Sequence, residues 1–188
     1  MRTLIRLVRV MNTITVTMEL DDTALVARAK AGESEALAGL YQRHARTLYT
    51  LALRMTAHPA TAEDMVQEAF LRAARALPGF RGDAPVAAWL KRLVANAVID
   101  HMRKQRPQVA AEVIDTMAAV AIEPGTSLDA VGLLRRLAPD ARSVVLLHEM
   151  EGYSHPEIAA MFGKTASWSK TLLARSIARL HTWLEEES

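Results

Sequence analysis

The sequence predicts an all-α protein made of two small helical domains joined by a flexible acidic linker. Hydrophobic residues make up 51% and charged residues 23% of the 188 residues, which is typical of a globular chain. Glycine and proline number only 8 and 7, and apolar residues recur at helical spacing, so a turn-rich β fold is disfavoured. Between the two helical parts, residues 108–126 carry acids, a Pro-Gly pair and no basic residue. That composition predicts the linker.

The first domain is predicted over residues 21–107, after an N-terminal extension, 1–20, whose order the sequence leaves open. Asp21 or Asp22 is expected to cap its first helix. A second helix is expected from Ser34, as its N-cap, to Met55. The third and fourth are expected at Thr61–Leu77 and, after a glycine-containing loop, up to about Arg106.

The second domain, residues 127–188, has the pattern of a helix-turn-helix. One helix begins at Pro139, and Ser154 with Glu157 predicts a capping box at the start of a short helix that ends at Gly163. A long helix follows from about Thr165. Its inward stripe is expected to consist of Leu173, Ile177, Leu180 and Leu184. The spacing alone leaves an ordinary helical hairpin with a solvated basic face as an equal alternative.

In a helix-turn-helix the long second helix enters a major groove of DNA. Five of its residues lie at the helix start or away from the inward stripe, and they are the candidates for phosphate and base contacts. These are Ser167, Trp168, Lys170, Thr171 and Arg175. The acidic C-terminal residues would be repelled by DNA and should point away from it.

The third helix of the first domain carries an acidic strip. Asp64, Gln67, Glu68 and the apolar Leu71 share one helix face, and Glu63 borders it. Such a strip suits docking on a basic helical partner. On composition alone a solvated helix face remains the favoured alternative.

The fourth helix is basic. Arg92, Asn96 and Arg103 share one face, and the guanidinium and amide groups are those that read base edges. The loop before it is small and polar, so its backbone could approach a ligand closely. Trp89 is expected to pack in the core rather than to stack on a base. The alternative to nucleic-acid binding is that the basic face of the fourth helix only keeps the protein soluble.

Composition also excludes several classes of protein. The chain has no cysteine, so it has no disulfide framework and no thiol nucleophile. No apolar run is long enough to cross a membrane, and the basic N-terminal segment has no clean apolar stretch of a signal peptide. We therefore expect a cytoplasmic protein without membrane insertion. No catalytic set, cofactor or metal site is evident, so we expect no enzyme activity.

Together these residues resemble the bacterial RNA polymerase sigma factors of the extracytoplasmic-function (group 4) type of the sigma-70 family. The resemblance runs from about Asp21 to the C-terminus and rests on motifs in a fixed order. They are the segments 62–70, 80–83 and 152–154, together with Trp89-Leu90, Asn96 and Asp100, Leu137-Ala-Pro, Glu157-Ile-Ala and Lys170.

The resemblance implies a mechanism. Residues 21–107 would be sigma region 2, whose strip of Glu63, Asp64, Gln67 and Glu68 binds the β′ clamp helices of core polymerase. The loop residues Phe80, Arg81, Gly82 and Asp83, with the helix that carries Asn96, would recognise and help to melt the −10 element, with one base flipped into a pocket. Residues 127–188 would be sigma region 4, which reads the −35 element and touches the β flap. The acidic linker would thread through the polymerase channels.

Some residues depart from the family pattern. Thr61 stands where an acid commonly precedes the acidic motif, so phosphorylation of Thr61 by a Ser/Thr kinase would restore negative charge beside Glu63. N-capping by Thr61 is the simpler reason for a threonine there. Trp168, Ser169 and Leu172 are unusual in the recognition helix, so the −35 sequence cannot be transferred from relatives. An anti-sigma protein that clamps both domains is the alternative route of control.

Two other functions compete with that of a sigma factor. A sigma-like decoy that binds an anti-sigma protein would usually carry an attached receiver domain. A stand-alone helix-turn-helix repressor would need a dimer interface to bind two half-sites, and no dimerisation helix is evident.

Overall fold

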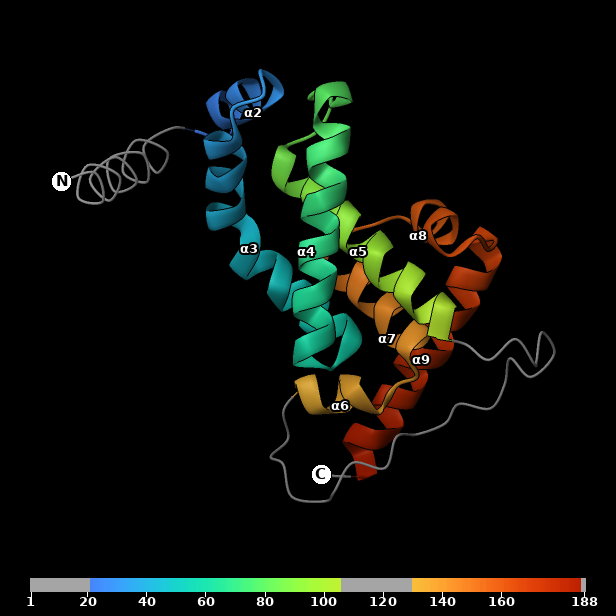
Figure 1. Ribbon diagram of the computed structural model, residues 1–188. Coiled ribbons are helices and arrows are strands. Elements are labelled where there is room, and N and C mark those ends of the chain that lie inside the picture. Colours follow the sequence, from blue (N-terminus) through green and yellow to red (C-terminus); the bar gives the residue numbers. More distant parts are fainter. Residues whose placement is uncertain (1–20, 106–129, 187–188) are drawn as a thin grey trace.

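The computed structural model describes residues 21–105 and 130–186, and within these ranges the regular secondary structure is entirely helical. Figure 1 shows the helices in two groups. The N-terminal unit contains α2 (Asp22–Lys30), α3 (Ser34–Thr56), α4 (Pro59–Ala76), a short 3-10 turn η1 (Leu77–Gly79) and α5 (Val86–Gln105). The C-terminal unit contains α6 (Ala130–Arg136), α7 (Pro139–Val145), a π-helical turn η2 (Leu146–Met150), α8 (His155–Phe162) and α9 (Ala166–Glu186). The predicted all-α fold of two units is confirmed. The predicted extension 1–20 and linker 108–126 lie outside the described residues.

The helix starts test the predicted caps. Asp21 caps α2, since its Oδ1 accepts a hydrogen bond of 2.7 Å from the backbone N–H of Ala24. Ser34 is not the cap of α3, because it is already the first helical residue. Thr61 is not a cap either. α4 begins two residues earlier at Pro59, where proline is favoured, and the His58 ring accepts the hydrogen bond from the Thr61 N–H.

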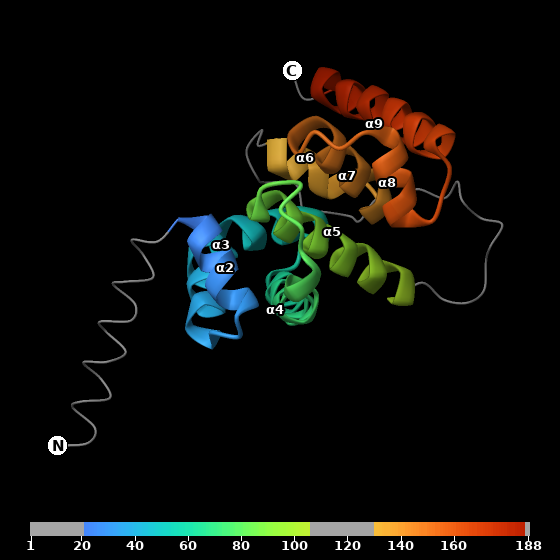
Figure 2. The same ribbon diagram turned by 90° about the horizontal axis from the view of Figure 1, so that it is seen from above.

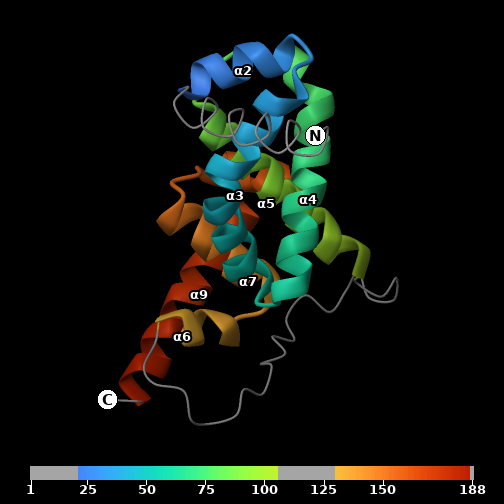
Figure 3. The same cartoon turned by 60° about the vertical axis from the view of Figure 1, so that its left-hand side comes forward.

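The N-terminal unit is built around α3, α4 and α5, each of which packs against the other two, with α2 across one end (Figures 1 and 3). Their apolar stripes supply large side chains that are fully buried, among them Leu40, Leu48, Leu90 and Val94. Burying each such side chain contributes about 2 kcal/mol, so this core fixes the relative orientation of the surfaces on α4 and α5.

In the C-terminal unit α9 packs across α7 and α8. Ser154 and Glu157 form the predicted capping box of α8, and Gly163 ends it in the left-handed conformation with φ 64°. Glycine is suited to that position because it has no Cβ. The predicted stripe of α9 is wrong at its end: Leu184 is 41% exposed, and Trp183 is the buried residue, at 8%.

The two units are in direct contact. Helix α3 contacts α7, α5 contacts α8, and buried residues of both units belong to one continuous hydrophobic core. In Figure 2 the C-terminal unit lies along one side of the N-terminal unit, and α9 lies on the side facing away from α4. The two units are therefore packed against each other in this structure.

Candidate nucleic-acid and protein interfaces

The acidic strip lies on the outer face of α4, where three of its four predicted members are exposed: Glu63, Asp64 and Gln67. Leu71, which continues the strip, is 57% exposed, a large value for a leucine. The outer face of α4 therefore carries exposed acidic and amide side chains, with an exposed apolar residue at its C-terminal end.

Glu68 differs from the other members because it is tied to α5. Its Oε1 accepts a hydrogen bond of 2.9 Å from Arg72 Nε, and Arg72 Nη1 donates one of 2.9 Å to Asp100 of α5. Asp100 also pairs with Arg103. The hydrogen bond from Arg72 holds the pKa of Glu68 below its usual value. This row of four alternating charges links the acidic face of α4 to the basic face of α5.

The loop between η1 and α5 is anchored at its first residue. The Phe80 ring packs on Trp89, with ring centres 4.8 Å apart, and the Phe80 carbonyl accepts a hydrogen bond of 2.8 Å from Lys30 Nζ of α2. Beyond that anchor the loop is exposed: Arg81 and Asp83 form an ion pair of 2.8 Å on either side of Gly82, whose φ is 81°. A fixed base with an exposed, polar tip suits a loop that meets a ligand.

The three residues of α5 that are predicted to contact DNA differ from one another in exposure and in their contacts. Arg92 is exposed and Asn96 is half-buried, while Arg103 is exposed and held by Asp100. Trp89 is half-buried against Phe80, as expected for packing. The face of α5 thus offers one exposed guanidinium and one amide near the loop.

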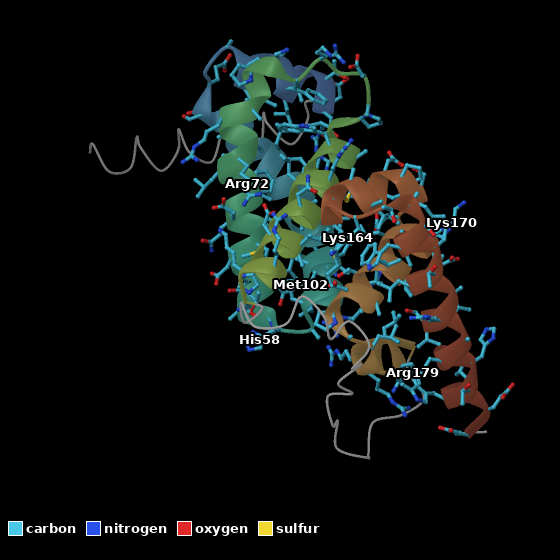
Figure 4. All side chains as sticks on the ribbon, turned by 90° about the vertical axis from the view of Figure 1, so that its right-hand side faces the viewer. His58, Arg72, Met102, Lys164, Lys170 and Arg179 are labelled. Carbon is cyan, nitrogen blue, oxygen red and sulfur yellow. The ribbon has the colours of Figure 1, made fainter. Side chains whose placement is uncertain are left out.

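On α9 four of the five predicted DNA-contacting residues are exposed: Ser167, Lys170, Thr171 and Arg175. Trp168 is half-buried, because its ring packs on Phe162 of α8 with centres 5.0 Å apart. Thr165 Oγ1 accepts a hydrogen bond of 3.2 Å from the Trp168 N–H, which satisfies one of the backbone donors at the start of α9. In Figure 4 Lys170 points outward at the edge of the molecule.

A pair of stacked histidines links η2, α8 and α9, and sequence reasoning missed it. His155 Nδ1 lies 3.1 Å from the hydroxyl of Ser169, which is completely buried on α9. The His155 ring stacks on His148, and His148 Nδ1 lies 2.9 Å from the Tyr153 carbonyl oxygen. Desolvation, with the nearby His148 and Lys170, lowers the pKa of His155. Only the unusual Ser169 in the sequence hinted at a polar contact here.

At the other end of α9 two guanidinium groups flank the ring of Trp183. Arg136 of α6 lies 4.3 Å from the ring centre and Arg179 lies 5.0 Å from it. Cation–π contacts of this kind favour a fixed position for α6 on α9.

Two absences hold for the described ranges, 21–105 and 130–186. Over these ranges no helix is both long and apolar enough to cross a membrane. In the same part of the chain, no cluster of three or more His, Asp or Glu side chains has the arrangement of a metal site.

Comparison with known proteins gives consistent matches. Residues 40–108 match the family described as Sigma-70 region 2, and residues 128–180 match Sigma-70, region 4. The chain is 35% identical to the ECF RNA polymerase sigma factor SigM of Mycobacterium tuberculosis, over 86% of this chain and 84% of that protein. It is 29% identical to the ECF RNA polymerase sigma-E factor of Escherichia coli, over 76% and 83% of the two chains.

Solved structures of other proteins also resemble this chain. CnrH in complex with the cytosolic domain of CnrY superposes with a TM-score of 0.57 and 30% identity, over 89% of this chain and 99% of that one. The sigma factor RpoE of Bartonella quintana, in complex with the anti-sigma factor NepR, superposes with a TM-score of 0.55 and 26% sequence identity. That match covers 77% of this chain and 94% of the RpoE chain.

Proposed function

Because the chain belongs to the extracytoplasmic-function sigma factors of the sigma-70 family, with region 2 in its N-terminal unit and region 4 in its C-terminal unit, we infer that it directs promoter-specific transcription initiation by RNA polymerase. It binds core polymerase, recognises the −35 and −10 elements and helps to open the −10 region. It acts by binding, and the chemistry of RNA synthesis belongs to the polymerase.

The observation that carries this function is the opposition of charge across region 2. The exposed acids of α4 and the exposed bases of α5 lie on neighbouring helices of one rigid core, and the row from Glu68 to Arg103 joins them. A protein that must hold a basic protein surface and an acidic nucleic acid at once needs both faces in a fixed relation.

The core-binding surface is proposed to be the strip of Glu63, Asp64, Gln67 and Glu68, with the exposed Leu71 at its C-terminal end. Its partner would be the clamp helices of the β′ subunit. The salt bridge to Arg72 leaves the Glu68 side chain 43% exposed, so it can still contribute to a polar contact.

The −10 element is proposed to meet the loop residues Phe80, Arg81, Gly82 and Asp83 together with Arg92, Asn96 and Arg103 of α5. Lys30 and Trp89 hold the base of the loop, so that its exposed tip can enclose an unstacked base. This assignment is supported by the exposure of the tip and the left-handed Gly82.

The −35 element is proposed to meet α9 through Ser167, Lys170, Thr171 and Arg175, which are exposed at its N-terminal half. Trp168 stays among the predicted contacts, although its packing on Phe162 limits it to the exposed edge of its ring. The N-terminal end of a recognition helix is the part that contacts base edges.

Control by Thr61 phosphorylation is proposed as one mode of regulation. Thr61 is the third residue of α4, and its hydroxyl lies 3.4 Å from His58 Nδ1. A phosphate at a helix N-terminus is favoured by the helix dipole, and it would add negative charge next to Glu63. Control by an anti-sigma protein is the alternative, supported by the related RpoE structure, which contains the anti-sigma factor NepR.

In vitro transcription tests the function. Core polymerase with this chain should initiate at its cognate promoter, found by mapping transcripts from genomic DNA, and core alone should not. A decoy would bind an anti-sigma protein without supporting initiation. A stand-alone repressor would bind its DNA as a dimer without core polymerase.

A further inference from the structure

Trp168 and Ser169, the unusual pair near the start of α9, lie in different settings. The Ser169 hydroxyl is completely buried and lies 3.1 Å from His155 Nδ1 of α8, so Ser169 faces the protein. Trp168 is half-buried: its ring packs on Phe162 of α8, with ring centres 5.0 Å apart, and the rest of the side chain reaches the surface. Trp168 therefore lies at the border between the buried and the exposed faces of α9.

The protein itself holds the Trp168 ring in place. The ring packs on Phe162, and the Trp168 N–H donates a hydrogen bond of 3.2 Å to Thr165 Oγ1, which restrains the backbone of the first turn. The buried contact between Ser169 and His155 joins the same turn of α9 to α8. A side chain that is already ordered loses little conformational entropy when it binds, so more of its contact energy appears as affinity.

Trp168 has polar and cationic neighbours on the exposed face of α9. Thr171 and Arg175 follow it after three and seven residues, so all three lie along one side of the helix, and both of these neighbours are exposed. Lys170 points outward in Figure 4, and residues 164–181 contain no acid. An apolar ring edge among hydroxyl groups and positive charges suits the major groove of DNA, which has phosphates at its rim and base edges at its floor.

The edge of an indole ring distinguishes bases mainly by apolar contact. In the major groove thymine is the base that presents a methyl group, whereas the other base-edge groups there are hydrogen-bond donors and acceptors. Apolar side chains, and the methyl group of threonine, are the ones that contact it. Trp168 and its neighbour Thr171 together offer such a surface. Burying one methyl group changes an affinity about fourfold, which is enough to favour thymine at one position.

We propose that Trp168 is a specificity-determining residue that reads the 5-methyl group of one thymine in the −35 element through the exposed edge of its ring, with Thr171 beside it. The proposal rests on the proposed function, since it concerns the same reading surface of α9. Two roles are then separate on the helix: Lys170 meets phosphate, which is present at every position, and the neutral ring adds a preference for one base.

Replacing thymine with uracil tests the proposal, because uracil pairs with adenine in the same way and lacks only the methyl group. The promoter found by mapping transcripts is prepared as duplexes in which each thymine of the −35 element, on either strand, is replaced in turn. Holoenzyme made with the full chain should bind one of these duplexes about fourfold more weakly than the parent, measured by competition with a fluorescent promoter. Equal binding of every duplex would overturn the proposal.

Trp168→Ala shows whether the deleted methyl group was in contact with this ring. In the variant the same uracil replacement should cause almost no further loss, although the overall affinity is lower. A general defect in folding or packing would weaken the binding of thymine and uracil duplexes equally and keep their ratio, and that result would contradict the proposal. Leu184→Ala truncates an exposed apolar side chain at the far end of α9 and is the matched control, which should keep the full ratio.

Salt and a guanine analogue give two further readouts. The ratio of thymine to uracil affinities should be the same at low and high salt, since no ionic contact is lost, and a ratio that shrinks with salt would count against the methyl contact. If 7-deazaguanine, rather than uracil, gives a loss that Trp168→Ala abolishes, the indole N–H reads guanine and the proposal is wrong. Normal initiation without a uracil effect overturns this proposal alone, whereas absence of promoter-specific initiation overturns the proposed function as well.

Discussion

His155 on α8 and Ser169 on α9 form a polar contact across the helix-turn-helix, with 3.1 Å between the imidazole Nδ1 and the hydroxyl oxygen. The Ser169 side chain is completely buried, so this hydroxyl has little access to water. The contact fixes the first turn of the recognition helix relative to α8. A charge on the imidazole would stand against the stacked His148 and near Lys170.

The first prediction concerns pH. The folded state holds the pKa of His155 below its usual 6.5, so the unfolded chain binds a proton more readily. Stability must therefore rise with pH in this range, and it should fall as the pH drops below about 6.5. Thermal unfolding between pH 8 and pH 5.5 should show this slope, and His155→Gln should reduce it. An equal slope in the variant would assign the effect to other groups.

The second prediction concerns the turn of the helix-turn-helix. Gly163 has φ 64°, where any Cβ is strained, so Gly163→Ala should lower the free energy of unfolding by about 1–2 kcal/mol. Gly79→Ala is the control, since Gly79 has no positive φ and a Cβ there would meet no atom within 4 Å. Urea unfolding of both variants measures the difference. Equal effects at the two sites would contradict the role of the left-handed conformation.

The third prediction concerns core binding. Asp64→Lys reverses a charge in the middle of the acidic strip and should reduce core polymerase binding at least tenfold, because like charges would then face each other. Asp64 is exposed, so the melting temperature should not change. Glu185→Lys, an exposed acid at the far end of α9, is the control and should bind core normally. Normal core affinity of Asp64→Lys would refute the assignment of the strip.

The fourth prediction concerns the recognition helix. Lys170→Glu should weaken binding of holoenzyme to the −35 element about tenfold or more and reduce the dependence of that binding on salt, since a phosphate contact is lost. Core binding should remain unchanged. Binding measured by fluorescence anisotropy over a range of salt concentrations tests both points. An unaltered salt slope would exclude a phosphate contact by Lys170.

The fifth prediction concerns the −10 loop. Lys30→Met removes the hydrogen bond to the Phe80 carbonyl, so the base of the loop should loosen. We expect normal core binding and a several-fold slower opening of the promoter, followed with a fluorescent base analogue in the −10 region. Lys164→Met, a lysine exposed near the start of α9, should open the −10 region at the wild-type rate. Normal opening by Lys30→Met would remove Lys30 from the positioning of the loop.

The sequence predicts those features that depend on residues close together in the chain. The capping box of Ser154 and Glu157 is complete within four residues, so its presence in the structure follows from the sequence alone. By contrast, Arg142 and Met55 are 87 residues apart, and no local pattern brings a side chain to a distant carbonyl. The cap of α4 was missed because an imidazole, His58, fills a position that usually holds a short oxygen side chain. The predicted contact residues on α4, α5 and α9 stay predictions.

The cation–π contacts of Trp183 have an optical consequence. The chain contains three tryptophans, and each lies in a different setting: Trp89 beside the −10 loop, Trp168 at the start of the recognition helix and Trp183 between two guanidinium groups. Replacing two of them at a time with phenylalanine leaves a single intrinsic fluorophore in each setting. Emission spectra during holoenzyme assembly would then report, without added dye, the order in which these three places change.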